Sequence, residues 1–177
     1  MLQSQLDSLI SSGDLSGKAF PCEGLDFTGR DLEYVNLSNC TGLTGEQLIS
    51  ASSLRYSTIP PVDFSGVDLT GKVLIGINGF HLVTGLTGEQ LASAAYIWCL
   101  NLPAVDFTGV DLTGKNLSVI DFSKCTGLTA QQLLSGSSIY GSTLPAIDFS
   151  GVDLSGLDIN SVDFSRCTGL TWDQITS

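Results

Sequence analysis

The sequence predicts an all-β solenoid, a four-sided β-helix, because it repeats with two nested periods. The long period is 42 or 43 residues: a block that begins TGLT recurs from Thr41, Thr84, Thr126 and Thr168. The short period is five residues, and it is carried by apolar side chains. One such run is Leu102, Phe107, Leu112, Leu117 and Phe122.

A five-residue period matches neither an α-helix, which repeats every 3.6 residues, nor a strand, which repeats every two. Apolar residues at this spacing face one interior only if the chain turns a corner every five residues. Four corners then close a coil of about twenty residues, and stacked coils hydrogen-bond at about 4.8 Å, the ordinary spacing between strands.

The neighbours of each inward residue support this interpretation. Val or Ile usually stands two positions before it, Asp or Asn one position before, and Ser or Thr one position after. Gly often follows, as at Gly66 and Gly109. Small hydroxyl residues and glycine are typical of tight turns, so they fit the corners.

These units carry a family resemblance. Val-Asp-Phe-Ser-Gly, Val-Asp-Leu-Thr-Gly and Val-Asp-Phe-Ser-Arg resemble the A(D/N)Lxx units of pentapeptide-repeat proteins, and matching units run from Phe27 to Phe164. The resemblance implies a right-handed quadrilateral β-helix and a bacterial origin. Val or Ile stands where that family most often has Ala, which implies a fuller interior.

Short helices are expected once in every 42 residues. In each 42-residue unit the inward positions trace two coils, with one extra residue inserted at two places. Both insertions flank the TGLT block. Thr44 with Gln47, and Thr129 with Gln132, have the spacing of a capping box. We expect helices near residues 44–52, 87–95, 129–136 and 171–176, like the GLTxEQL helices of pentapeptide-repeat relatives. The alternative is a bulged β-face at each place.

A single domain is expected, in which an N-terminal capping helix at residues 1–14 precedes a pentapeptide-repeat β-helix at 15–177. The first has an apolar helical face made of Leu2, Leu6, Leu9 and Ile10. After Trp172 and Ile175 three interpretations stay open: a short helix caps the last coil, the chain is a fragment of a longer protein, or the open end dimerises.

Charge and cysteine content restrict the partners and the location. Seven basic and 18 acidic residues give a net charge of −11, which disfavours direct nucleic-acid binding and anionic membranes and favours basic partners. Neither a classical signal peptide nor a membrane span is predicted. Five irregularly spaced cysteines argue against a disulfide framework. A cytoplasmic, reducing location is therefore expected; the alternative is secretion by a non-classical or effector route.

The cysteines and the single histidine are interpreted as structural. Cys40, Cys125 and Cys167 precede the TGLT blocks, and Val83 takes the same place in the second repeat, which indicates a small buried residue. Two coils separate such cysteines, beyond disulfide reach, and no zinc-ligand spacing exists. Cys22 is expected to face inward, and Cys99 is unassigned. His81 is expected on the surface of a bulged corner.

Six aspartates form two candidate acidic columns. They are Asp63, Asp68, Asp106, Asp111, Asp148 and Asp153. One interpretation is an acidic stripe that imitates the phosphates of DNA or attracts a basic partner. The favoured one is that they cap corners, since the resemblance implies Asp or Asn at these places whatever the function. Single carboxylates at this spacing are unsuited to a metal ion.

Four aromatic residues form the candidate interaction face. Tyr56, Tyr96, Trp98 and Tyr140 follow the expected helices and lie on one side of the rod. Tyr and Trp are enriched at binding interfaces. The alternative is that they pack the helices against the coils.

The predicted function is that of a non-enzymatic scaffold for protein–protein interaction. No phosphate-binding loop, GxSxG, HExxH or EF-hand pattern occurs, so no catalytic, cofactor-binding or metal-binding residue is expected. The resemblance implies a bacterial effector or recognition module, or alternatively a DNA-mimicking regulator of gyrase; a structural repeat fragment is the third possibility. The expected partner is an unidentified protein, and the expected state is a monomer or an end-to-end dimer.

Overall fold

The computed structural model describes residues 3–4, 7, 10 and 19–176. The predicted capping helix therefore lies largely outside the described residues, as do Leu2, Leu6 and Leu9 of its apolar face. The four described positions in this segment are helical. The side chain of Gln3 donates to the backbone oxygen of Asp26 at 2.9 Å and accepts from its N–H at 3.1 Å, and Arg30 pairs with Asp7 at 2.6 Å.

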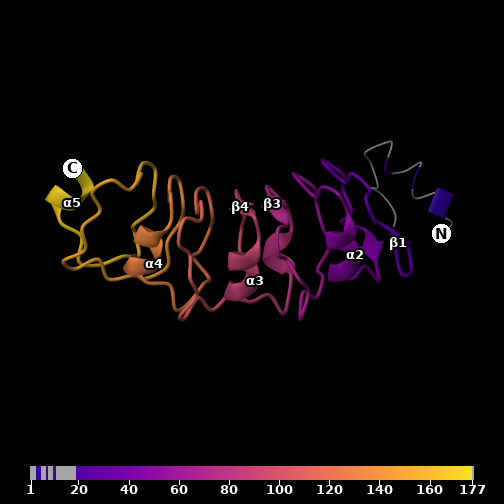
Figure 1. Ribbon diagram of the computed structural model, residues 1–177, viewed down its shortest axis with the longest axis horizontal. Coiled ribbons are helices and arrows are strands. Elements are labelled where there is room, and N and C mark those ends of the chain that lie inside the picture. Colours follow the sequence, from indigo (N-terminus) through magenta and orange to yellow (C-terminus); the bar gives the residue numbers. More distant parts are fainter. Residues whose placement is uncertain (1–2, 5–6, 8–9, 11–18, 177) are drawn as a thin grey trace.

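From Phe20 onward the chain forms a rod of successive coils, with β1 (Phe20–Pro21) near one end and α5 (Trp172–Thr176) near the other (Figure 1). Strand β1 (Phe20–Pro21) pairs in parallel with β2 (Cys40–Thr41), and β3 (Val73–Ile75) pairs with β4 (Tyr96–Trp98). Isolated parallel bridges join other pairs of residues that are 20 to 22 positions apart in the sequence. Each coil thus hydrogen-bonds to the next. The four flat sides and the right-handed course stay predictions.

Short helices occupy the TGLT blocks. They are α2 (Gly45–Ser50), α3 (Gly88–Ser93), α4 (Ala130–Ser135) and α5 (Trp172–Thr176). In α2, α3 and α4 the block's second threonine is the N-cap and forms a capping box with the glutamine three residues later. These segments are helices rather than bulged β-faces, because the capping box satisfies the exposed N–H groups of the first turn.

The glutamine of each capping box also ties its helix to the preceding coil. Its Oε1 accepts from the N-cap backbone N–H, and its Nε2 donates to two corner carbonyls 22 to 26 residues earlier. For Gln132 the two acceptors are the carbonyls of Phe107, at 2.6 Å, and Val110, at 2.9 Å. One side chain therefore holds two coils together.

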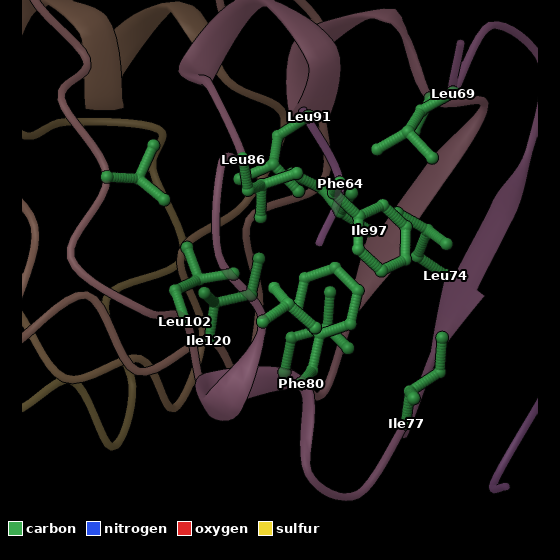
Figure 2. Packing of buried hydrophobic residues seen from close by; sticks show 14 of the residues in the cluster. Phe64, Leu69, Leu74, Ile77, Phe80, Leu86, Leu91, Ile97, Leu102 and Ile120 are labelled. Carbon is green, nitrogen blue, oxygen red and sulfur yellow. The ribbon is translucent and has the colours of Figure 1, made fainter. Parts of the chain in front are cut away.

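The interior is a continuous column of apolar side chains. Phe107, Leu112, Leu117 and Phe122 are fully buried at five-residue steps. Aromatic pairs recur along the core, with ring centroids 5.6 to 6.0 Å apart in Phe64–Phe80, Phe107–Phe122 and Phe149–Phe164. Figure 2 shows Phe64 and Phe80 among aliphatic side chains from neighbouring coils.

The second repeat departs from the others at a short 3-10 helix, η1 (Phe80–Leu82). It follows Gly79, whose φ of 83° is left-handed. Phe80 is buried, whereas His81 and Leu82 are exposed.

Cys22 and Cys40 form a disulfide, with their Cα atoms 5.6 Å apart. The expectation of no disulfide was wrong, because it tested only cysteines two coils apart. These two are 18 residues apart and lie in adjacent coils. Cys99, Cys125 and Cys167 are free thiols, and burial raises the pKa of Cys125 to about 11.

Candidate interaction face

One side of the rod is built from corresponding four-residue segments of successive coils, and we call it the aromatic wall. Its segments are residues 31–34, 53–56, 73–76, 96–99, 116–119, 138–141 and 158–161. Parallel bridges align their first residues, for example Asp31 with Ser53 and Asn116 with Ser138. The pairing of β3 with β4 lies in the middle of the wall (Figure 1).

The last residue of every segment has a left-handed backbone. These corner residues are Tyr34, Tyr56, Gly76, Cys99, Val119, Gly141 and Ser161, with φ between 55° and 64°. They include all five non-glycine residues with positive φ in the described part of the chain. Corner N–H groups donate to the next coil, as from Tyr34 to the Arg55 oxygen at 3.0 Å. Backbone strain of this kind tends to gather at functional sites.

The predicted aromatic residues all lie on this wall, at the first, third and fourth positions of its segments. Tyr96 begins its segment, Trp98 and Tyr140 share the third position, and Tyr56 is a corner residue. Tyr56, Tyr96 and Tyr140 are 37%, 61% and 44% exposed, and Trp98 is half-buried. Such exposure argues against the alternative that they pack helices against coils.

Tyr34 belongs to the same face, although sequence reasoning missed it. Its ring stacks on that of Tyr56, with centroids 5.2 Å apart and planes 13° apart. The Tyr56 ring in turn covers Gly76, where a Cβ atom would lie 2.5 Å from the ring. The only signal in the sequence was the 22-residue spacing of the two tyrosines, which equals a coil length seen in several bridges.

Charge on the wall differs from charge on the rest of the rod. Between residues 53 and 141 its segments contain no acidic residue, and Arg55 is exposed there. The residues immediately before each segment form a column along one border of the wall. This column holds Lys72 and Lys115, and we call these two lysines the basic edge. Lys72 donates to the Ile49 oxygen at 2.6 Å and Lys115 to the Ala94 oxygen at 2.7 Å, which stabilises the C-terminal ends of α2 and α3.

Two shallow grooves lie along the basic edge. One, of about 480 Å³, is lined by Ser53, Arg55, Lys72 and Val73 among others. The second, of about 420 Å³, is lined by Tyr96 and Lys115 among others and lies one long repeat further on. Glu33 also lines the first groove, so that groove holds charges of both signs.

The predicted acidic columns are used by the corners themselves. In all six aspartates Oδ1 accepts the backbone N–H two residues later, at 2.8 to 2.9 Å. Asp63, Asp106 and Asp148 also accept a hydroxyl at 2.7 Å. These hydroxyl and N–H donors hold the pKa of the three carboxyls below the usual range.

The acidic columns are also interrupted. Bridges pair Asp63 with Thr84, Asp106 with Thr126 and Asp148 with Thr168. Carboxylates of this column therefore recur only every second coil, about 9.6 Å apart. No group of three or more His, Cys, Asp or Glu side chains that could hold a metal ion occurs among the described residues.

Comparison with known proteins supports the repeat. Residues 133–168 match the family model of pentapeptide repeats in eight copies, so this part of the chain consists of such repeats. Searches of curated proteins and of solved structures found no significant match. In the part of the chain that the structure describes, no helix is long and apolar enough to cross a membrane.

Proposed function

We propose that this protein is a non-enzymatic scaffold, a right-handed four-sided β-helix that binds a protein partner through the aromatic wall. The observation that carries the proposal is the wall itself: exposed aromatic side chains and strained corner residues share one side of the rod. The parallel bridges and the pentapeptide repeats at residues 133–168 support the fold.

A flat side of a solenoid suits recognition. Stacked repeats form an extended rigid surface, so a partner binds without ordering the scaffold. Tyr and Trp provide large contact areas, and their polar atoms still form hydrogen bonds at an interface. The lack of acidic residues in the wall between positions 53 and 141 lowers the cost of desolvation there.

The polar groups elsewhere support a scaffold rather than an enzyme. The corner aspartates hold turns, with pKa values lowered by their donors, which is unsuited to a general base at neutral pH. Burial raises the pKa of Cys125, which disfavours a reactive thiolate. His81 lies exposed on η1.

A gyrase regulator that mimics DNA is the second candidate, favoured by the net charge of −11. Gyrase supercoiling measured with the wild type and with a variant carrying Asn at Asp63, Asp106 and Asp148 tests it. Asparagine retains the corner acceptor and removes the charge. Inhibition by the wild type that the variant loses would favour DNA mimicry over the aromatic wall.

The main proposal is tested by selecting binders from a random peptide display library on the immobilised wild-type protein. Selected peptides are then titrated against the double variant Tyr96→Ala/Tyr140→Ala and against Leu82→Ala. Leu82 is similarly exposed but lies on η1, outside the wall. We expect at least a ten-fold loss of affinity for the double variant alone. Peptides that bind both variants equally, or a selection that enriches none, would contradict the proposal.

A further inference from the structure

Tyr34 lies in the coil immediately before that of Tyr56; from Tyr56 onward, the aromatic residues of the wall recur every second coil. They lie in the segments 53–56, 96–99 and 138–141, and one coil separates each from the next. Two coils span about 9.6 Å along the rod, from the usual spacing of hydrogen-bonded strands. A ligand that runs along the axis therefore meets an aromatic row at this interval.

One peptide conformation has the same interval. A polyproline II helix repeats every three residues with a rise of about 3.1 Å each, or about 9.3 Å per turn. An α-helix has a pitch of about 5.4 Å, and the side chains of a strand return to one face every two residues, about 6.7 Å. Over the two intervals between the three aromatic segments, the length of two polyproline II turns differs from the axial span of the segments by only about 0.6 Å.

The basic edge has the same spacing as the aromatic rows. Lys72 and Lys115 are aligned through Ala95, whose N–H donates to the Lys72 oxygen at 2.9 Å, so they are two coils apart. Each ammonium group has three donors, and one of them binds a helix carbonyl at 2.6 or 2.7 Å. Acidic side chains at every third residue of a ligand would meet these two ammonium groups.

We infer that the aromatic wall binds a proline-rich segment in the polyproline II conformation, with acidic side chains at every third residue. This inference rests on the proposed function. Prolines stack on the rings of Trp98 and Tyr140 and contact the exposed edge of Tyr56, the acidic side chains contact the basic edge, and the ligand's free carbonyls accept from tyrosine hydroxyls and the Trp98 N–H. Both surfaces are preformed, so little conformational entropy is lost.

Fluorescence anisotropy with three labelled peptides tests the inference. The first is (Pro-Ala-Glu)5, the second has the same composition with irregular proline spacing, and the third is (Pro-Ala-Lys)5. We expect the first to bind the wild-type protein at least ten-fold more tightly than the other two. Equal binding of the first and second peptides would overturn the inference.

Two pairs of variants locate the site. Tyr140→Ala is expected to weaken (Pro-Ala-Glu)5 binding at least ten-fold and Lys115→Gln at least three-fold. The matched controls, Leu82→Ala and Lys124→Gln, change exposed residues outside the wall and are expected to have no effect. Thermal melting confirms that each variant is folded. Binding that survives Tyr140→Ala in a folded protein would overturn the inference.

The display selection separates this inference from the proposed function. Selected peptides that require the wall but lack prolines at intervals of three, together with no binding of (Pro-Ala-Glu)5, would refute the inference and leave the proposed function intact. The absence of any wall-dependent peptide, natural or synthetic, would refute both. A dimer that Tyr96→Ala abolishes in light scattering would identify a second copy as the occupant and overturn the inference.

Discussion

Replacing Gln132 with alanine removes the side chain that joins α4 to the preceding coil. Gln132 accepts from the Thr129 N–H at 2.8 Å, which caps the helix, and donates to the carbonyls of Phe107 and Val110 at 2.6 and 2.9 Å. Its amide is partly buried, so water only partly replaces these contacts. The change therefore acts on local helix formation and on stacking of the coils at once.

The expected loss follows from these three hydrogen bonds. Each contributes about 0.5–1.5 kcal/mol net, and the two corner carbonyls lose a donor in a region that the helix still shields. Alanine has a slightly higher helix propensity, which offsets a few tenths of a kcal/mol. We expect Gln132→Ala to lower the free energy of unfolding by about 2–4 kcal/mol.

Gln131 provides a matched control within the same helix. It is exposed, and its side chain makes no hydrogen bond to any described residue. Urea unfolding followed by circular dichroism should show Gln131→Ala within about 0.5 kcal/mol of the wild type. Equal stability of the two variants would refute the conclusion that the capping-box glutamine holds the coils together.

Three further predictions concern the corners and the first coil. Gly127→Ala should destabilise the protein more than Gly109→Ala in urea unfolding. Both glycines have positive φ, which costs an L-residue roughly 1–2 kcal/mol, but only at Gly127 would a Cβ also collide with the Asp106 corner. Equal losses of stability in the two variants would contradict this. The pKa of Asp106 is lowered by its donors in the folded state, so its contribution to stability is complete above the pKa of the unfolded chain and is lost as pH falls through the folded value. Asp106→Asn should therefore lose less stability than the wild type between pH 5 and pH 2, and parallel pH profiles would refute that role. The Cys22–Cys40 disulfide closes a loop of 18 residues, so its reduction should lower the free energy of unfolding by about 3 kcal/mol and raise the rate of hydrogen exchange at residues 20–40. A Cys22→Ala/Cys40→Ala variant should not respond to the reductant.

Features that depend on neighbours along the chain could be predicted from the sequence. The inward positions around Phe107 and Leu112 follow from a five-residue period, and the starts of α2 and α4 follow from capping boxes spanning three residues. The aspartate corners are also local, because each carboxylate binds an N–H two residues later. The sequence predicted which residues form the acidic columns and the aromatic face, and what these residues bind stays a proposal.

Features that depend on which residues lie above one another came only from the tertiary structure. Coils differ in length from 20 to 23 residues, so equal spacing in sequence is not equal position. Tyr56 and Trp98 are one long repeat apart, yet Tyr56 is a corner residue and Trp98 precedes the corner at Cys99. The stack of Tyr34 on Tyr56, the Cys22–Cys40 disulfide and the glutamine contacts between coils all depend on this register. A one-residue insertion changes the sequence separation of the residues that align across its coil, while the corners remain aligned. The sequence by itself therefore determined what faces inward and where the chain turns, and the tertiary structure decided which side chains meet on the outside of the rod.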